Sequence, residues 1–198
     1  MQKKQIALFG GSFDPPHLAH QQIPVFLLQE SFVDEVWYVP VKHHPFGKVV
    51  SLDKDRLHML HTVIQHIVVQ HPEYEEKLRI ESWELEQNQK SYTIQTLEEL
   101  SAQYPDVHFR WVIGSDNLEQ FHLWHHYQEI LQNYGVFVYP REKYPAEPLR
   151  EGMTLLEHAP TVVVSSTQVR AAVQASTSIS SLVLPEVEQF ILQHKLYT

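Results

Sequence analysis

The chain has 198 residues, a length typical of one domain or of one domain with a small appendage. It contains no cysteine, which excludes disulfide bonds, a thiolate nucleophile and cysteine metal ligands. Its formal net charge of −9 argues against a nucleic-acid partner, which would need a basic face. No stretch approaches the roughly 20 apolar residues of a membrane span, and the first apolar run is too brief for a signal peptide. We therefore expect a cytoplasmic protein with no membrane partner.

The first half of the sequence alternates between strand-like and helix-like patterns. The run at residues 5–9 predicts a buried strand, and a helix is expected from Pro16 to about Glu30, because proline is favourable in a first helical turn. Pro24 lacks a backbone N–H, so we expect a kink or break of that helix there. The elements predicted next are a strand at 35–41, a helix at 52–70 with Asp53 as its N-cap, a strand at 78–85 and a serine-capped helix at 91–104.

The second half continues the same alternation. Such a pattern implies the α/β class, with a parallel sheet covered by helices on both faces and ligands beyond the carboxyl ends of the strands. We expect a single domain over residues 1–198, with residues from about 165 to 198 as its helical C-terminal portion. The predicted elements are strands at 107–114, 135–140 and 161–164, short helices near 116–122 and 124–132, and helices at 165–174 and 185–196.

The stretch GGSFDPPHLAH, at residues 10–20, follows the first strand directly and has the composition of a phosphate site. Gly10 and Gly11 allow a phosphate to approach the backbone closely, and the N–H groups of the turn and of the next helix then face the anion. His17 and His20 are three residues apart, so both imidazoles lie on one face of that helix. The stretch matches neither the G-x-G-x-x-G fingerprint nor a Walker A loop.

Two other interpretations of this stretch stay open. The glycines can form an ordinary strand–helix turn, with both histidines as caps or packing groups. His17 and His20 can also form a zinc pair, although the sequence offers no obvious third ligand nearby. We expect no metal site among the remaining histidines either and interpret these as surface or partly packed residues: His58, His61, His122, His125 and His126.

The stretch VVVSSTQVR, at residues 162–170, is a second candidate phosphate site. It runs from a strand-like segment through three hydroxyl side chains into a helix, whose first N–H groups have no partner within the helix. Arg170 lies one turn further on and can bind phosphate oxygens with its fork of donors. Taken alone, the stretch is equally typical of a well-capped helix with a surface arginine.

Together, GGSFDPPHLAH and SSTQVR resemble the H-x-G-H nucleotidyltransferase superfamily, which is related to the class I aminoacyl-tRNA synthetases. KSYTIQTLEEL, at 90–100, resembles the S-Y-T-x-x-T-L segment of the bacterial nicotinate mononucleotide adenylyltransferases. Residues 111–130 and 136–145 are similar to their G-x-D…W and strand-then-Arg segments. The five matches are collinear and cover nearly the whole chain, so the sequence is identified as a member of that family.

The resemblance implies a Rossmann-like open parallel sheet of the nucleotidyltransferase type and a site for ATP. It assigns the catalytic roles to His17, His20 and Arg170. Gly114 and Asp116 would lie near the nucleotide sugars. The residues implied around the triphosphate are Gly10, Gly11, Ser12, Phe13, His17 and His20 on one side, and Ser165, Ser166, Thr167 and Arg170 on the other.

The resemblance also implies a site for a pyridine mononucleotide. Trp124 would stack on the pyridine ring, and Tyr92 and Thr93 would meet its carboxyl group. Lys48 and Arg56 are the nearest counterparts of the family's remaining cations on this side. The chain departs from the family pattern at three places: Ala19 replaces the glycine of H-x-G-H, the loop VKHHPFGK at 41–48 replaces P-P-H-K, and Pro24 interrupts the first helix.

The family's reaction transfers the adenylyl group of ATP to the 5′-phosphate of nicotinate mononucleotide, giving deamido-NAD and pyrophosphate in NAD biosynthesis. A phosphate monoester has a second pKa of about 6, so the attacking group is already an anion at neutral pH and needs no general base. Catalysis then rests on alignment and on neutralising the charge of the transferred group. We expect Mg²⁺ to arrive with ATP, held by phosphates and water.

Two functional alternatives remain at this point. The same fold and chemistry can serve nicotinamide mononucleotide or another phosphate-ester acceptor. Ala19 and the altered loop at 41–48 are also compatible with a non-catalytic nucleotide-binding module. The sequence leaves the oligomeric state open, a homo-oligomer included.

Overall fold

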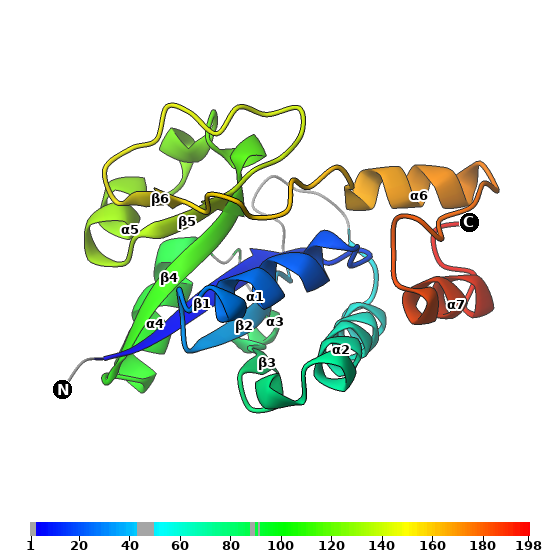
Figure 1. The fold of residues 1–198 in the computed structure, drawn as a ribbon, viewed down its shortest axis with the longest axis horizontal. Helices are drawn as coiled ribbons and strands as arrows, with labels where there is room; N and C mark the ends of the chain where they lie inside the picture. The colour runs from blue at the N-terminus through cyan, green and yellow to red at the C-terminus, as the bar shows by residue number, and fades with distance from the viewer. Residues whose placement is uncertain (1–2, 43–49, 88–89, 91) are drawn as a thin grey trace.

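The computed structural model describes residues 3–42, 50–87, 90 and 92–198, and its centre is a six-stranded parallel sheet. The strands are β1 (Lys4–Gly11), β2 (Glu35–Pro40), β3 (Leu78–Ile80), β4 (Val107–Gly114), β5 (Val136–Tyr139) and β6 (Met153–Leu155). Their order is β3-β2-β1-β4-β5-β6, so the chain moves outward from β1 and then returns to its other side (Figure 1). Successive strands are added on one side of β1 up to β3 and on the other side from β4 onward. Open parallel sheets bind ligands at such a reversal of strand order, here between β1 and β4.

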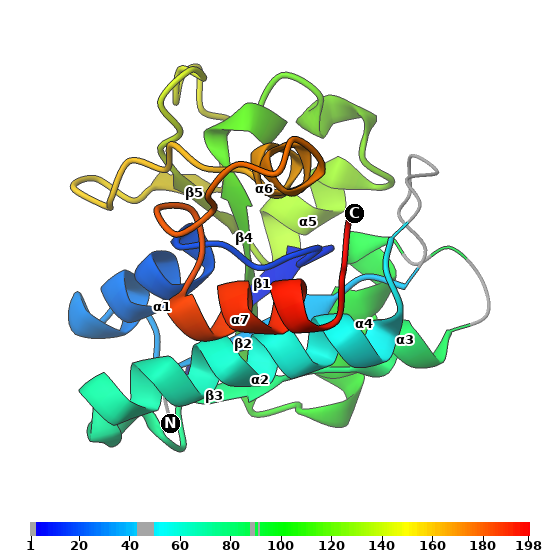
Figure 2. The same cartoon turned by 90° about the vertical axis from the view of Figure 1, so that its right-hand side faces the viewer.

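Helices cover both faces of the sheet, which confirms the predicted α/β class. One apolar core cluster holds side chains of α1 (Ala19–Gln29), α2 (Asp53–Gln70), α6 (Ser166–Gln174) and α7 (Pro185–Gln193). The second cluster, on the other face, holds side chains of α4 (Thr93–Gln103) and α5 (Tyr127–Asn133). Helix α7 packs against α2 and lies below α6 at one end of the molecule (Figure 2).

The apolar run of β1 supplies both clusters because successive side chains of a strand point to opposite faces. Ala7 and Phe9 belong to the first cluster, whereas Ile6 and Leu8 belong to the second. A central parallel strand is buried on both sides, so it needs a continuous apolar run instead of an alternating one. This places the turn after β1 at the middle of the sheet edge.

Helix α1 passes through Pro24 without interruption, so a break of the helix there is wrong, while the expected kink stays a prediction. A proline at this position cannot donate an N–H to the carbonyl of His20, four residues earlier. That carbonyl instead accepts a hydrogen bond from the buried hydroxyl of Tyr38, at 2.7 Å. A side chain of β2 therefore replaces the missing helical hydrogen bond, and Pro24 stays buried inside the helix.

Several predicted boundaries on the first side of the sheet also shift. Helix α1 begins at Ala19 and not at Pro16, because the chain up to Leu18 still belongs to the turn after β1. Leu52, not Asp53, is the N-cap of α2. The strand predicted at 78–85 ends at Ile80, and its remainder forms the short helix α3 (Trp83–Glu86).

The later boundaries differ in a similar way. The serine expected to cap the helix at 91–104 lies outside the described residues, and Tyr92 is the N-cap of α4. Residues 161–164 join the sheet only through a bridge between Arg141 and Val162, whereas the three-residue edge strand β6 was missed. Single turns of 3-10 helix form at Pro72–Tyr74, Ser115–Asn117 and Phe121–Leu123.

The hydrogen bond from the Tyr38 hydroxyl to the His20 carbonyl leads to a stability prediction. We expect Tyr38→Phe to lower the free energy of unfolding in urea by about 1–3 kcal/mol, because it leaves the buried carbonyl of His20 without a donor. Pro24→Ala should recover most of that loss in the Tyr38→Phe background, because alanine restores the helical N–H. An equal effect of Pro24→Ala in both backgrounds would contradict this role of the hydroxyl.

Candidate active site

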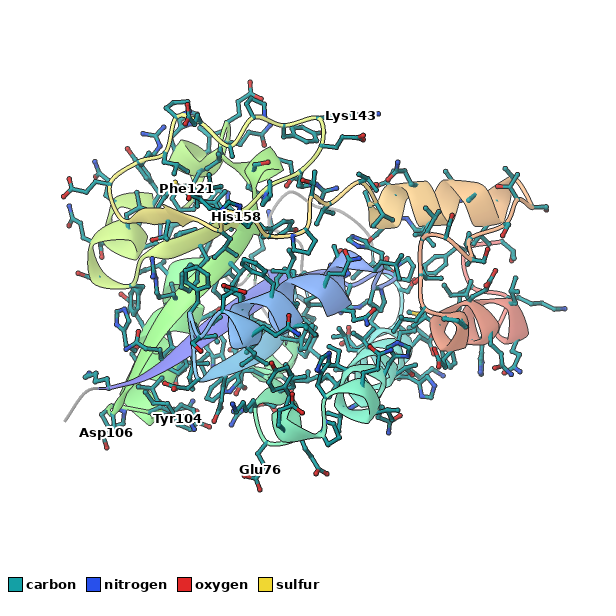
Figure 3. The ribbon with its side chains drawn as sticks, viewed as in Figure 1. Glu76, Tyr104, Asp106, Phe121, Lys143 and His158 are labelled. Atoms are coloured by element: carbon teal, nitrogen blue, oxygen red, sulfur yellow. The ribbon has the colours of Figure 1, made fainter. Side chains whose placement is uncertain are left out.

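A cavity of about 870 Å³ opens at the carboxyl ends of β1, β4 and β5. Its walls come from the turn after β1, the start of α4, the loops after β4 and β5, and the start of α6. In Figure 3, Phe121 and Lys143 mark the two loops that rise beyond β4 and β5. Thirteen of the residues proposed from the sequence line it: Gly10, Gly11, Ser12, Phe13, His17, His20, Tyr92, Thr93, Asp116, Trp124, Ser165, Ser166 and Thr167.

Gly10 is required by a close approach between neighbouring strands. A Cβ atom at this position would lie 2.1 Å from the indole ring of Trp111, which lines the cavity from β4. At this distance the bulky indole ring would have to shift from its place in the core. The backbone at the end of β1 therefore packs directly on the Trp111 ring, and the turn that follows lines the cavity.

His17 and His20 lie together in this turn, with ring centroids 3.9 Å apart. The backbone N–H of His17 donates to Nδ1 of His20 at 2.8 Å, so a neutral His20 carries its proton on Nε2. The His20 ring packs between Phe9 and Phe13, at centroid distances of 5.5 and 4.9 Å. The pair thus lies in an aromatic pocket at the end of β1.

Both histidines are neutral donors at physiological pH in the free protein. Burial, with a further contribution from the charge of Arg141, lowers the pKa of His20 to about 3. Burial, followed by His20 and Arg141, lowers the pKa of His17 well below its usual value. Nδ1 of His17 is buried and has no hydrogen-bond partner among the described residues. A buried nitrogen of this kind is costly unless a ligand or water pairs with it.

Arg141 is a cavity residue that the sequence analysis did not select. It follows β5 and lies close to the acidic side chain of Asp116, with a nitrogen–oxygen distance of 3.6 Å. Its Nη2 atom donates to the carbonyl of Val164 at 3.0 Å, whereas its Nε atom is buried without a partner among the described residues. Its place in the strand-then-Arg segment at 136–145 was the available signal.

The start of α6 closes the cavity opposite the histidines. Ser165 caps the helix by accepting the N–H of Gln168 at 3.3 Å. The hydroxyl of Ser166 donates to the carbonyl of Pro15 at 2.9 Å, which ties the helix to the turn after β1. The two phosphate motifs found in the sequence are therefore in direct contact in the fold.

Arg56 and Arg170 were predicted to touch the substrates, but neither lines the cavity. Arg170 donates to the carbonyl of Asp14 at 2.6 Å, and Arg56, which is fully buried, donates to the carbonyl of Ser12 at 2.7 Å. Both arginines therefore bind the backbone of the turn, and Arg170 also donates to the hydroxyl of the cavity residue Thr167 at 3.3 Å. We interpret them as positioning residues for the turn.

Two further predicted residues also lie outside the cavity lining or outside the described chain. Gly114 does not line the cavity, but a Cβ atom there would lie 2.4 Å from Oδ1 of Asp116. Its role is therefore to give room to that carboxylate beside Arg141. Lys48 lies outside the described residues.

The other end of the cavity is aromatic. Trp124 packs on Phe121 with ring centroids 5.0 Å apart, and Tyr92 lies against His125 at 4.7 Å. Tyr92 is 36% exposed, so its ring is available to a ligand. This end is suited to a flat ring, while the turn after β1, at the other end, is suited to an anion.

Glu84 lines the aromatic end and was also missed from the sequence. Its side chain is buried, and one of its oxygens accepts the hydroxyl of Thr96 at 2.7 Å. Burial raises the pKa of Glu84 to about 7, although the hydrogen bond from Thr96 opposes this effect. The sequence E-L-E at 84–86 gave no sign of which glutamate is buried.

Comparisons with known proteins agree with this geometry. A family model described as cytidylyltransferase-like matches residues 8–172. The chain belongs to the cytidylyltransferase-like family. A protein of Cytophaga hutchinsonii named as a probable nicotinate-nucleotide adenylyltransferase is 37% identical over 197 residues, which cover 98% of each chain. A protein of the same name from Salinibacter ruber is 33% identical over 198 residues, with 97% of each chain covered.

Solved structures show the same fold. The nicotinic acid mononucleotide adenylyltransferase of Plasmodium falciparum in complex with NaAD superposes with a TM-score of 0.82, over 98% of this chain and 97% of that one. Its sequence is 19% identical, so this likeness concerns the fold alone. The comparisons confirm the family resemblance and the nucleotidyltransferase type of the sheet.

The donor set around the turn does not form a metal cage. Among the described residues there is no group of three or more His, Asp or Glu side chains that could hold a metal ion. Both carboxylate oxygens of Asp14, the acidic residue of the turn, accept hydrogen bonds from protein groups. The described helices also include none long and apolar enough to cross a membrane.

The buried carboxyl group of Glu84 leads to a pH-dependent stability prediction. Its pKa is raised on folding from about 4.5 to about 7. The charge of the carboxylate therefore lowers the free energy of unfolding fully above pH 7, and this loss disappears below pH 4.5, where the group is protonated in both states. We expect Glu84→Gln, which still accepts the Thr96 hydroxyl, to gain about 2 kcal/mol of unfolding free energy relative to wild type between pH 5 and pH 8. The exposed Glu86, on the same short helix, provides the control variant Glu86→Gln. The prediction would be contradicted if the unfolding free energies of Glu84→Gln and wild type changed with pH in the same way.

Proposed function

We propose that this chain transfers the adenylyl group of ATP to the 5′-phosphate of nicotinate mononucleotide and releases pyrophosphate. The product is deamido-NAD, a precursor in NAD biosynthesis. The relatives with full-length coverage bear the name of this activity. The observation that supports the assignment most strongly is the cavity itself, which joins desolvated nitrogen donors of His17 and Arg141 at one end to the aromatic group of Tyr92 and Trp124 at the other.

The ATP phosphates are proposed to lie between the turn after β1 and the start of α6. His17 and His20 are neutral, so they act as hydrogen-bond donors whose effect is strengthened by the dry surroundings. Arg141 supplies the positive charge, and the helix N-terminus at Ser165 adds its partial positive charge. Together these groups stabilise the charge that develops on the transferred phosphoryl group and on the departing pyrophosphate.

Arg56 determines how one peptide of the turn faces the substrate. In a trans peptide the carbonyl and the following N–H point in opposite directions. Arg56 holds the carbonyl of Ser12, so the N–H of Phe13 points away from the guanidinium. We propose that this N–H is one of the donors to the phosphates, and that the predicted catalytic role of Arg170 is likewise to hold the turn.

Mg²⁺ is proposed to enter with ATP. Supplied in this way, it would neutralise part of the charge of the phosphates. The ion would be held by phosphates and water, because the described carboxylate of the turn, Asp14, is already occupied by two donors. The cytoplasmic location and a homo-oligomeric state stay predictions from the sequence.

The acceptor mononucleotide is proposed to lie at the aromatic end. Trp124 would stack on the pyridine ring, and the N-terminus of α4 at Tyr92 and Thr93 would receive its carboxylate, because N–H groups at a helix start favour an anion. Exposed apolar side chains at the cavity mouth fit the faces of flat rings: Leu123, Tyr144 and Val163.

Pyrophosphate release tests this function directly. With ATP and Mg²⁺, we expect turnover with nicotinate mononucleotide and a clear preference over nicotinamide mononucleotide. His17→Ala and Arg141→Ala should each lower kcat by on the order of 100-fold or more, because each removes a preorganised donor to the phosphates. The exposed His122 lies outside the cavity, so His122→Ala serves as the control with wild-type turnover.

The other outcomes separate the alternatives. Turnover only with a different phosphate ester would keep the chemistry and change the acceptor. ATP binding with no turnover on any acceptor would favour the non-catalytic nucleotide-binding module.

A further inference from the structure

The segment after α7 returns to the turn after β1. Helix α7 ends at Gln193, and Lys195 and Tyr197 then adopt left-handed backbone angles, with φ of 51° and 65°. This brings the hydroxyl of Tyr197 to Oδ1 of Asp14, to which it donates at 2.8 Å across 183 positions of sequence. Figures 1 and 2 both show the chain beyond α7 rising toward α6.

Asp14 is the point where three segments meet the turn. Its Oδ1 accepts from Tyr197, its Oδ2 accepts the N–H of Ser51 at 3.2 Å, and its carbonyl accepts from Arg170. The residue is only 2% exposed, so water cannot easily replace a lost donor. Asp14 follows Phe13, whose φ of 48° is itself unusual for a residue with a side chain.

A buried carboxylate keeps its position only while its oxygens are paired. The Tyr197 hydroxyl is a durable donor, because burial and the nearby charge of Asp14 both raise the pKa of Tyr197. Of the other charged groups that face it, Arg170 opposes that rise. Removing the hydroxyl would therefore leave Oδ1 of Asp14 to seek water, which requires the turn to move away from its position beside His17.

We propose that Tyr197 is a positioning residue for the phosphate-binding turn, and that docking of residues 194–198 on Asp14 and binding of ATP favour each other. The inference rests on the proposed function, in that ATP is the ligand of the turn. The reciprocity is a thermodynamic requirement: if the docked segment improves ATP binding, then ATP strengthens the docking by the same factor.

The test compares Tyr197→Phe with wild type through binding of a non-hydrolysable ATP analogue, measured by calorimetry. We expect the analogue to bind about 10-fold more weakly to the variant, which is the size of effect typical of a lost hydrogen bond to a charged group. Tyr134→Phe is the matched control, because its hydroxyl bonds to Ser101 and lies outside the cavity lining. The control should keep wild-type affinity.

Hydrogen exchange supplies a readout that a purely structural role would not move. In wild type, the analogue should slow amide exchange in the peptide that contains residues 194–198. The same protection should be absent in Tyr197→Phe. This comparison in wild type needs no variant, so it decides the question even if Tyr197→Phe fails to fold.

A double-mutant cycle tests whether Asp14 carries the effect. In the Asp14→Ala background, which has no acceptor for the Tyr197 hydroxyl, Tyr197→Phe should have little further effect on analogue binding. A full 10-fold loss in that background would overturn the inference, as would a Tyr197→Phe protein that melts at a lower temperature but binds the analogue like wild type.

The exchange result can overturn the inference as well. Exchange in residues 194–198 that is unaffected by the analogue in wild type would show that docking and binding are independent. A wild-type protein that binds the analogue without releasing pyrophosphate contradicts the proposed function but not this coupling, whereas one that binds no analogue contradicts both.

Discussion

Desolvation of nitrogen donors at the end of β1 is the constraint on which the rest of the site depends. His17, His20 and Arg141 line the cavity where the sheet reverses its order, and the rings of Phe9 and Phe13 pack against His20. The burial that costs these groups their water also strengthens any interaction they make with an anion. Because the histidines are held neutral, their contribution is direction and hydrogen bonding, while Arg141 places a positive charge beside them.

In the proposed function, this acidic protein binds a highly charged nucleotide with few cationic side chains in direct contact. Three arginines each donate to a backbone carbonyl beside the site: Arg56 to Ser12, Arg170 to Asp14 and Arg141 to Val164. The contacts of Arg56 and Arg141 fix trans peptide planes and turn the N–H groups of Phe13 and Ser165 in the opposite direction. The carbonyl of Asp14 precedes Pro15, which has no N–H, so the contact of Arg170 fixes only the position of the backbone. The net charge of −9 is compatible with the proposed phosphate binding, because an oriented amide such as the N–H of Phe13 can act as a donor without adding a cation.

Much of this arrangement could be predicted from the sequence. The buried run of β1, the glycine turn and the His17–His20 pair are local signals, and collinear motifs brought in Ser165–Thr167, Tyr92 and Trp124. Local signals could not give the direction of a long side chain. Arg56 and Arg170 have the expected positions in sequence, yet both donate to backbone carbonyls of the turn and neither lines the cavity.

The residues that were missed depend on contacts distant in sequence. Glu84 is buried because Thr96 of α4 lies beside it, and Tyr197 reaches Asp14 only through the packing of α7 on α2. Pro24 is tolerated because Tyr38 of a neighbouring strand supplies a hydrogen bond. Each of these outcomes follows from tertiary packing that overrides a sound local rule.

The most direct measurement is a crystal structure with a non-hydrolysable ATP analogue and Mg²⁺. We predict phosphate oxygens within hydrogen-bond distance of a ring nitrogen of His17 and of the Arg141 guanidinium, with Arg56 and Arg170 still bound to their carbonyls. Phosphates that bind elsewhere, and leave the turn after β1 without contact, would contradict the assignment of this cavity.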